Sequence, residues 1–268
     1  MRLIGASIVG FCAVLLMFAA ICGPASALTA DEVLKGASER YDKFTSSVKD
    51  LTIEQEMTVV QGQMKTQMKM MRKGAKYRVE STTSTPPSSE GAQRPPMTTT
   101  MIFDGKDTWI VSPFAGKRRL EADEALGRGP ELSWTERLKG RLVLLGEEKV
   151  ADRNAWVIEV KQDEKSPAGP EPFSKVWIDT GNYWMLKAQS KMPNGIAESR
   201  FSDFRKVQGD FSMPFLHEVF IDGVLQSKSV TKSIKTNSGL SDDLFDASKL
   251  KSEGPSLEDM IKQNRQGK

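Results

Sequence analysis

The stretch Met101–Arg119, MIFDGKDTWIVSPFAGKRR, decides the fold of this 268-residue chain. Two apolar runs flank the turn residues Asp104-Gly105-Lys106, and this arrangement is typical of a β-hairpin. The larger apolar side chains fall mainly on odd positions, and alternate residues of a strand share a face. We therefore expect a single apolar face, formed by Met101, Phe103, Trp109 and Val111. Such a face lines either a closed core or a ligand cavity.

The residues before this hairpin indicate one helix and several strands. The capping-box spacing of Thr29 and Glu32 marks a helix start, and apolar residues then recur at three- and four-residue steps through Val48. From Leu51 to Glu80 the apolar period is two, which predicts an antiparallel meander with one apolar face. Residues 82–97 hold four prolines and are expected to form a flexible hairpin tip.

The residues after the hairpin continue in the same style. A short helix is expected within Pro130–Lys139, and strands follow from Leu142 to Lys235, separated by Gly-, Asn- and Asp-containing turns. The count is ten or eleven strands, mostly in sequential hairpins. The pattern predicts a mainly β (α+β) fold: one large antiparallel sheet, curled or half-closed, with a helix or two on its apolar face.

The N-terminus reads as an export signal. Arg2 precedes an apolar run from Leu3 to Cys22, and the small residues Ala25-Ser26-Ala27 follow it. This order is typical of a secretory signal peptide, residues 1–27, cleaved after Ala27. The run is long enough for the alternative of an uncleaved anchor. Lipidation of Cys22 is the other alternative, and the bulky Ile21 before it argues against that modification.

The remaining chain has no cysteine, because both cysteines precede residue 28. Its stability must therefore come from a large core rather than from disulfides. Loss of Arg2 lowers the net charge from +3 to +2, and no basic run stands out. This balance gives no indication of a nucleic-acid partner.

Catalytic and metal-binding patterns are sparse. The only histidine is His217, no cysteine nucleophile remains, and there is no G-x-S-x-G elbow after residue 27. One histidine without cysteine disfavours zinc, and the SDDLFD segment at Ser241 lacks the glycine and final glutamate of a calcium loop. A glycosidase carboxylate pair stays open, since no spacing singles one out. We expect a protein that is not an enzyme, with no cofactor and no metal.

Methionines are concentrated in one region, where five fall between positions 57 and 71. Methionine is flexible and polarizable and suits surfaces that repack around variable apolar partners. Ordinary core filling explains the cluster equally well. A copper(I) site of thioethers is a third reading, and no histidine or cysteine nearby supports it.

Taken in order, these segments resemble the periplasmic lipoprotein carrier LolA and its superfamily. The strand, the Asp104-Gly105-Lys106 turn and the aromatic strand ending in Ser112-Pro113-Phe114 match the family's order. The segments MRKGAKYR at Met71–Arg78, VWIDTGNYWMLKAQ and LSDDLFD resemble further family segments. The resemblance spans nearly all of residues 28–250, with 251–268 left as a C-terminal tail.

The resemblance implies an incomplete β-barrel with a helical lid over an apolar cavity that receives acyl chains of lipoproteins or lipids. It implies a monomeric periplasmic carrier that takes cargo from an inner-membrane transporter to an outer-membrane acceptor. A lipid- or lipoprotein-sensing regulatory protein of the same fold, as the relative RseB is, is the alternative. The expected cavity residues are Leu34, Tyr41 and Phe44 on the helix and Met57, Val59, Met68, Met70, Tyr77, Val79, Met101, Phe103, Trp109 and Val111 on the sheet.

The chain departs from the family at the expected lid latch. Carriers of this family place an arginine followed by proline on the third strand, where it bonds to carbonyl oxygens of the lid helix. Lys73-Gly74 occupies that place here, with Arg72 beside it. Arg72 and Lys73 are therefore the expected gating residues, although a lysine cannot reproduce the forked contacts of an arginine.

Overall fold

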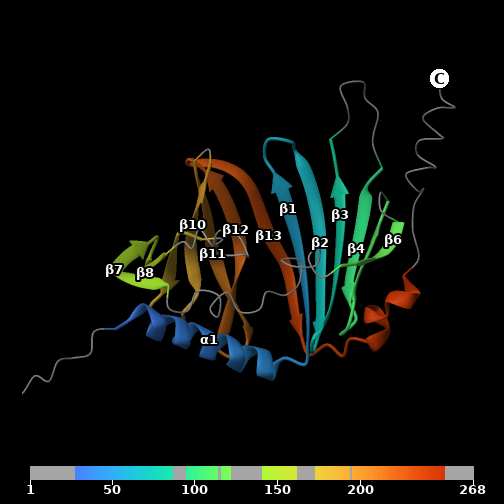
Figure 1. Ribbon diagram of the computed structural model, residues 1–268, viewed down its shortest axis with the longest axis horizontal. Helices are drawn as coiled ribbons and strands as arrows, with labels where there is room; N and C mark the ends of the chain where they lie inside the picture. Colours follow the sequence, from blue (N-terminus) through green and yellow to red (C-terminus); the bar gives the residue numbers. More distant parts are fainter. Residues whose placement is uncertain are drawn as a thin grey trace, which may run out of the picture.

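The computed structural model describes residues 28–86, 95–113, 116–121, 141–161, 173–193 and 195–250. Their core is a single 13-stranded sheet, and every paired strand in it is antiparallel. The strand order is β6-β5-β4-β3-β2-β1-β13-β12-β11-β10-β9-β8-β7, so β1 and β13 join two runs of sequential hairpins. The sheet is curved and open, with β6 and β7 at its two edges (Figure 1).

The first run of hairpins begins after the helix α1, Ala30–Ser47. Its strands are β1 Asp50–Val59, β2 Met64–Lys73, β3 Lys76–Ser84, β4 Met97–Phe103, β5 Thr108–Ser112 and β6 Gly116–Leu120. The second run consists of β7 Leu142–Val150, β8 Arg153–Val160, β9 Lys175–Asp179, β10 Met185–Met192, β11 Gly195–Gln208, β12 Phe211–Ile221 and β13 Val224–Thr236. Two short 3₁₀ helices follow, η1 Asp242–Phe245 and η2 Ala247–Lys249.

The helix α1 starts where its capping box predicts. The hydroxyl of Thr29 accepts a hydrogen bond from the backbone N–H of Glu32, and the Glu32 carboxylate accepts one from the N–H of Thr29. Two backbone donors of the first turn are thereby satisfied, and the acidic side chain favours the helix N-terminus. These hydrogen bonds also hold the pKa of Glu32 below its usual value.

We call the side of the sheet on which α1 packs the inner face, and the opposite side the outer face. The first turn of α1 buries Ala30 and Val33 against β8, β9 and β10, whose core residues there are Trp156, Ile158, Val176, Ile178 and Ala188. At the other end of the helix, Phe44 stacks on Phe211 of β12 with ring centroids 4.0 Å apart. Val48 and β1 complete that cluster. The helix thus runs across one end of the sheet from β7 to β1 (Figure 1).

The outer face carries its own core. Over β8–β10 it holds Ala155, Val157, Trp177 and Leu186. Over β2 and β4 it is covered by the segment Asn237–Leu250, which we call the closing segment. Phe245 of this segment is 1% exposed and packs on Met71 and Ile102. Both faces of the β2–β4 region therefore bear apolar side chains.

The architecture confirms the predicted mainly β fold with a single curved antiparallel sheet and a helix on it. The strand count of ten or eleven was too low, and the edge strand β6 was not among the predicted strands. The predicted helix within 130–139, the signal peptide at 1–27 and the tail at 251–268 lie outside the described residues. Among the helices that the structure describes, none has the length and apolar character needed to cross a membrane.

Candidate ligand-binding site

Eight of the ten sheet residues predicted to line a cavity share the inner face of β1–β4. The strand registers place Met70, Val79 and Met101 in one row and Tyr77 beside Phe103 in the next. Met57 and Met68 lie on the same face but pair with polar residues. We call these eight residues the apolar wall. They are Met57 and Val59 of β1, Met68 and Met70 of β2, Tyr77 and Val79 of β3, and Met101 and Phe103 of β4.

The apolar wall differs in burial from the core beneath α1. Seven of its side chains are half-buried, and only Tyr77 is fully buried, at 6% exposed. Tyr77 stacks on Phe103 with centroids 5.5 Å apart, which fixes the base of the wall. Met70 also packs against the cluster around Phe44, so the wall begins where α1 ends. The arrangement is an apolar surface of repackable side chains next to a rigid core.

Trp109 and Val111 do not belong to this wall, contrary to the sequence prediction. Phe103 pairs with Thr108, so the even-numbered residues of β5 continue the inner face. The Asp104 carboxylate accepts hydrogen bonds from the backbone N–H groups of Lys106 and Asp107, at 2.8 and 2.9 Å, and draws Asp107 into the turn. The loop thus has four residues, and every side chain after it changes face.

The same register reveals wall residues that sequence reasoning missed. Ile110 pairs with Met101 and extends the inner face, and Leu120 of β6 pairs with Thr108 at its edge. The sequence gives no signal for the face of Ile110, since it is apolar like its neighbours on both sides. Trp109 instead lies on the outer face beside Lys117, whose ammonium is 5.9 Å from the indole centroid.

The helix residues predicted to close the cavity divide into two groups. Leu34 and Phe44 are buried at 6% and 5% exposed, and Phe44 packs on Phe211 of β12. Tyr41 is 42% exposed, so it does not close over the sheet. Of the predicted lid residues, Phe44 is the one that packs in the cluster that Met70 borders.

The predicted latch residues lie on opposite faces of β2. Arg72 pairs with Leu51 and Tyr77 and lies on the inner face. Lys73 lies on the outer face, where its ammonium donates to the carbonyl oxygen of Leu240 at 2.9 Å and to the Asp242 carboxylate at 2.8 Å. The prediction that Lys73 holds the lid helix is wrong, because Lys73 holds the closing segment.

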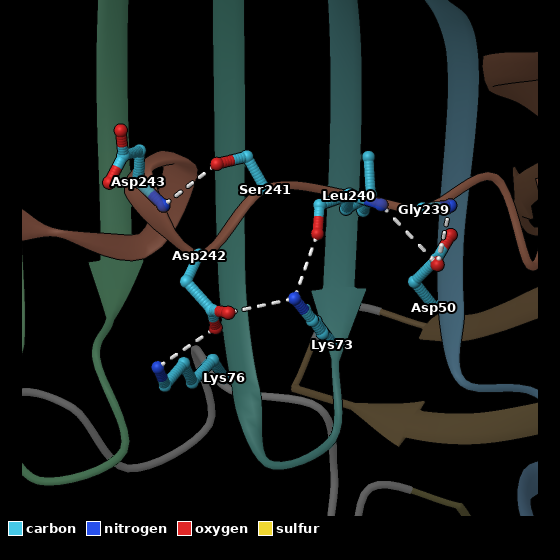
Figure 2. Close-up of polar contacts among 8 residues, drawn as sticks. All are labelled: Asp50, Lys73, Lys76, Gly239, Leu240, Ser241, Asp242 and Asp243. Carbon is cyan, nitrogen blue, oxygen red and sulfur yellow. Dashed lines mark hydrogen bonds and ion pairs between the residues drawn. The ribbon is translucent and has the colours of Figure 1, made fainter.

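Asp50 and two lysines tie the closing segment across the bases of β1–β3 (Figure 2). The Asp50 carboxylate accepts hydrogen bonds from the backbone N–H groups of Ser238 and Gly239 at 2.8 and 2.9 Å, and a longer one from Leu240. Burial opposes ionisation of Asp50, but these donors and the Ser238 hydroxyl outweigh it and lower its pKa.

Asp242 completes the ties from the closing segment. Its carboxylate accepts hydrogen bonds from Lys73 and Lys76, which lower its pKa. This pair of contacts is solvent-exposed at Asp242 and adds little by itself. Arg78 donates to the carbonyl oxygen of Leu244 at 3.1 Å, further along the same segment. The closing segment is therefore held by both polar ties and the buried Phe245.

A small cleft of about 170 Å³ lies apart from the apolar wall, between α1 and the β11–β12 turn. Arg40 lines it and donates to the carbonyl oxygen of Asp210 at 3.1 Å. Within the described ranges, no group of three or more histidine, cysteine or acidic residues is arranged to hold a metal ion.

His217 of β12 stands on the inner face in the same cross-strand row as Met57. It pairs with Ser229, which pairs with Met57, and its ring stacks on Phe201 at 4.6 Å. Burial lowers the pKa of His217 from the ordinary 6.5. Its Nε2 is buried and has no hydrogen-bond partner in the part of the chain that the structure describes. The side chain is therefore neutral at pH 7.

Folding stability is expected to fall as the pH drops below 6.5 because of His217. The unfolded imidazole gains a proton near its ordinary pKa, whereas the folded one resists protonation until the pH reaches its lower value. The free energy of unfolding, measured with urea at about pH 7.5 and about pH 5, should therefore decline less in His217→Gln than in the parent protein. Equal declines in both proteins would contradict this account.

Comparison with known proteins supports the fold. No family model and no curated protein sequence matches the chain. Among solved structures, a DUF1329 family protein from Desulfovibrio piger matches at a TM-score of 0.56 and 16% identity, covering 82% of this chain and 98% of its own. A domain described as an outer membrane lipoprotein-sorting protein, from Vibrio parahaemolyticus, matches at 0.52 and 16%, covering 80% and 96%. The chain therefore has the LolA-like fold of these proteins, as its ordered segments predicted.

Proposed function

We propose that the protein is a carrier that shields acyl chains of lipoproteins or lipids against its apolar wall. The observation that carries this proposal is the wall itself. Eight apolar side chains share the inner face of β1–β4, and seven of them are only half-buried. The likeness to a lipoprotein-sorting domain agrees with it at the level of the fold.

The energetics of acyl chains favour such a surface. Each methylene group in water costs about 0.8 kcal/mol, so a long chain does not cross an aqueous compartment unaided. A carrier must offer apolar contact without the tight packing that would make release slow. Half-buried methionines meet both needs, because their side chains adapt to the shape of a guest without strong strain.

The proposed route of the cargo rests on the resemblance of the sequence to periplasmic carriers. If the N-terminal segment directs export, the carrier works in the periplasm and moves cargo from an inner-membrane transporter towards an outer-membrane acceptor. A single copy of the chain has all the wall residues on its own strands, so the proposed carrier works as a monomer. No catalytic group, cofactor or metal is needed for this role.

Native mass spectrometry of the exported, purified protein tests the proposal. We expect adducts whose masses match phospholipids, fatty acids or acylated peptides, and these should be lost on mild collisional activation. A delipidated sample should recover the adducts when it is mixed with a soluble fluorescent fatty acid. A protein that carries no adduct and takes up no fluorescent fatty acid would overturn the proposed function.

A further inference from the structure

The most exposed large apolar side chains gather at one end of the sheet. Eight such residues occur in the described part of the chain, and five of them lie at hairpin tips of this end. We call these five the hairpin rim. They are Val60 (45% exposed), Met64 (37%), Met192 (47%), Ile196 (48%) and Val224 (59%). Exposed apolar groups clustered in this way mark an interaction site rather than random surface.

Hydrogen bonds join the three hairpin tips into one edge. The tips belong to the β1–β2, β12–β13 and β10–β11 hairpins, which are neighbours in the sheet (Figure 1). The N–H of Val60 donates to the carbonyl oxygen of Gln226 at 2.8 Å. Asp222 and Ile196 exchange two hydrogen bonds, both at 3.0 Å. The rim is therefore a continuous hydrogen-bonded edge, with Met64 and Met192 on its inner face and Ile196 on its outer face.

Exposed basic residues accompany the apolar ones at two of the three tips. Lys65 follows Met64, Lys191 precedes Met192, and Lys228 lies four residues after Val224. Lys228 is paired with Glu218, whereas Lys65 and Lys191 are exposed and form no ion pair among the described residues. The one acidic residue of the three tips, Asp222, accepts a hydrogen bond from the neighbouring tip. Lys65 and Lys191 thus border the apolar rim without an ion-pair partner among the described residues, and Asp222 is the one acidic residue at the tips.

The rim is also continuous with the apolar wall. Val59 of the wall pairs with Met64 of the rim, and both lie on the inner face. From there the wall continues along the same strands towards α1 through Met57, Met68 and Met70. An acyl chain that enters at the rim would meet these apolar side chains and, between them, the polar residues Thr66 and Gln55.

We propose that the hairpin rim docks on the surface of an anionic lipid bilayer. An apolar side chain beside a lysine suits this interface, since the apolar group enters the headgroup boundary while the ammonium stays at the level of the phosphates. This inference rests on the proposed carrier function and adds the place where cargo passes between membrane and protein. The rim would bring the open end of the wall against the bilayer.

Vesicle co-sedimentation tests the docking. The full exported protein should bind vesicles of phosphatidylglycerol and phosphatidylethanolamine and bind phosphatidylcholine vesicles weakly. The double variant Met192→Asp/Val224→Asp should lose about tenfold in partitioning to the anionic vesicles. Replacing Lys65 and Lys191 by glutamine should lower the partitioning to anionic vesicles by about fivefold per lysine at low salt.

Matched controls keep these outcomes specific. Leu145→Asp places the same charge at a 50%-exposed residue of the far edge strand, and Lys149→Gln/Lys206→Gln removes two exposed lysines elsewhere. Both should bind vesicles like the parent protein. The rim variants should still take up a soluble fluorescent fatty acid, which separates failed docking from failed carriage. Equal losses in rim and control variants, or a parent protein that binds no anionic vesicles, would overturn the proposal and leave the rim as a contact for another protein.

Discussion

Replacing Met68 by glutamate is expected to abolish acyl binding while leaving the fold intact. Met68 is half-buried in the middle of the apolar wall on β2. A carboxylate there must either stay hydrated, which keeps water in the acyl site, or lose its water against the ligand at a high cost. We expect the affinity for a fluorescent fatty acid to fall by about tenfold or more. The fold should tolerate the change because Met68 pairs with the polar residues Gln55 and Ser81.

Gln67→Glu is the matched control for this variant. Gln67 is the preceding residue of β2, its side chain is exposed on the outer face, and the substitution adds the same charge with almost no change in shape. Gln67→Glu should bind the fatty acid with the affinity of the parent protein. Its folding stability should fall slightly, because the new carboxylate faces Glu56. Far-UV circular dichroism and urea unfolding should show both variants folded. If Met68→Glu binds the fatty acid as tightly as Gln67→Glu does, the apolar wall is not the binding surface.

Sequence alone gave the correct face for the first wall strands because their apolar pattern alternates. In β1 and β2 the methionines and valines stand mainly between polar residues, so the period of two identifies one face regardless of the turn between them. Met57, Val59, Met68 and Met70 were thus assigned together, and the register places them together.

The apolar pattern of the β4–β5 hairpin does not alternate, so it does not identify the inner face. Residues 101–103 and 109–111 are apolar at every position, because the inner face carries the wall and the outer face lies on the side of the closing segment. Periodicity then identifies no face, and the assignment depends on whether the turn has three or four residues. A turn of four residues, held by the Asp104 carboxylate, reversed the expected face of Trp109 and Val111.

The role of Lys73 could not be predicted for a different reason. Its partners Leu240 and Asp242 are more than 160 residues away in the sequence, and no local pattern reports on which face a distant segment will pack. The resemblance to the carrier family predicted a latch at this position. The chain does have a cation there, since Lys73 binds the closing segment. The segment that it holds lies on the outer face, and the first residue of that segment, Asn237, donates a hydrogen bond to the carbonyl oxygen of Ser47 at the end of α1.

Asp50 is the buried centre of that tie. It is the first residue of β1 and is 4% exposed, and its carboxylate serves donors on consecutive residues of the closing segment. The fixed segment buries Phe245 over Met71 and Ile102, directly behind the apolar wall. The same strands therefore carry the apolar wall on one face and the packed closing segment on the other.

Asp50→Ala is expected to lower the free energy of unfolding by about 3 kcal/mol, since it leaves the N–H groups of Ser238 and Gly239 without their acceptor. Urea unfolding followed by tryptophan fluorescence measures this change. The pKa of Asp50 is lowered in the folded state, so its contribution to the free energy of unfolding is complete above the ordinary value of 3.8 and is lost as the pH falls through the folded pKa. Asp50→Ala should lack this loss of stability in acid. Asp243→Ala, at an exposed carboxylate of the same segment, should change stability by less than about 0.5 kcal/mol. Equal stabilities of the Asp50 and Asp243 variants would show that Phe245, and not the carboxylate, holds the closing segment on the sheet.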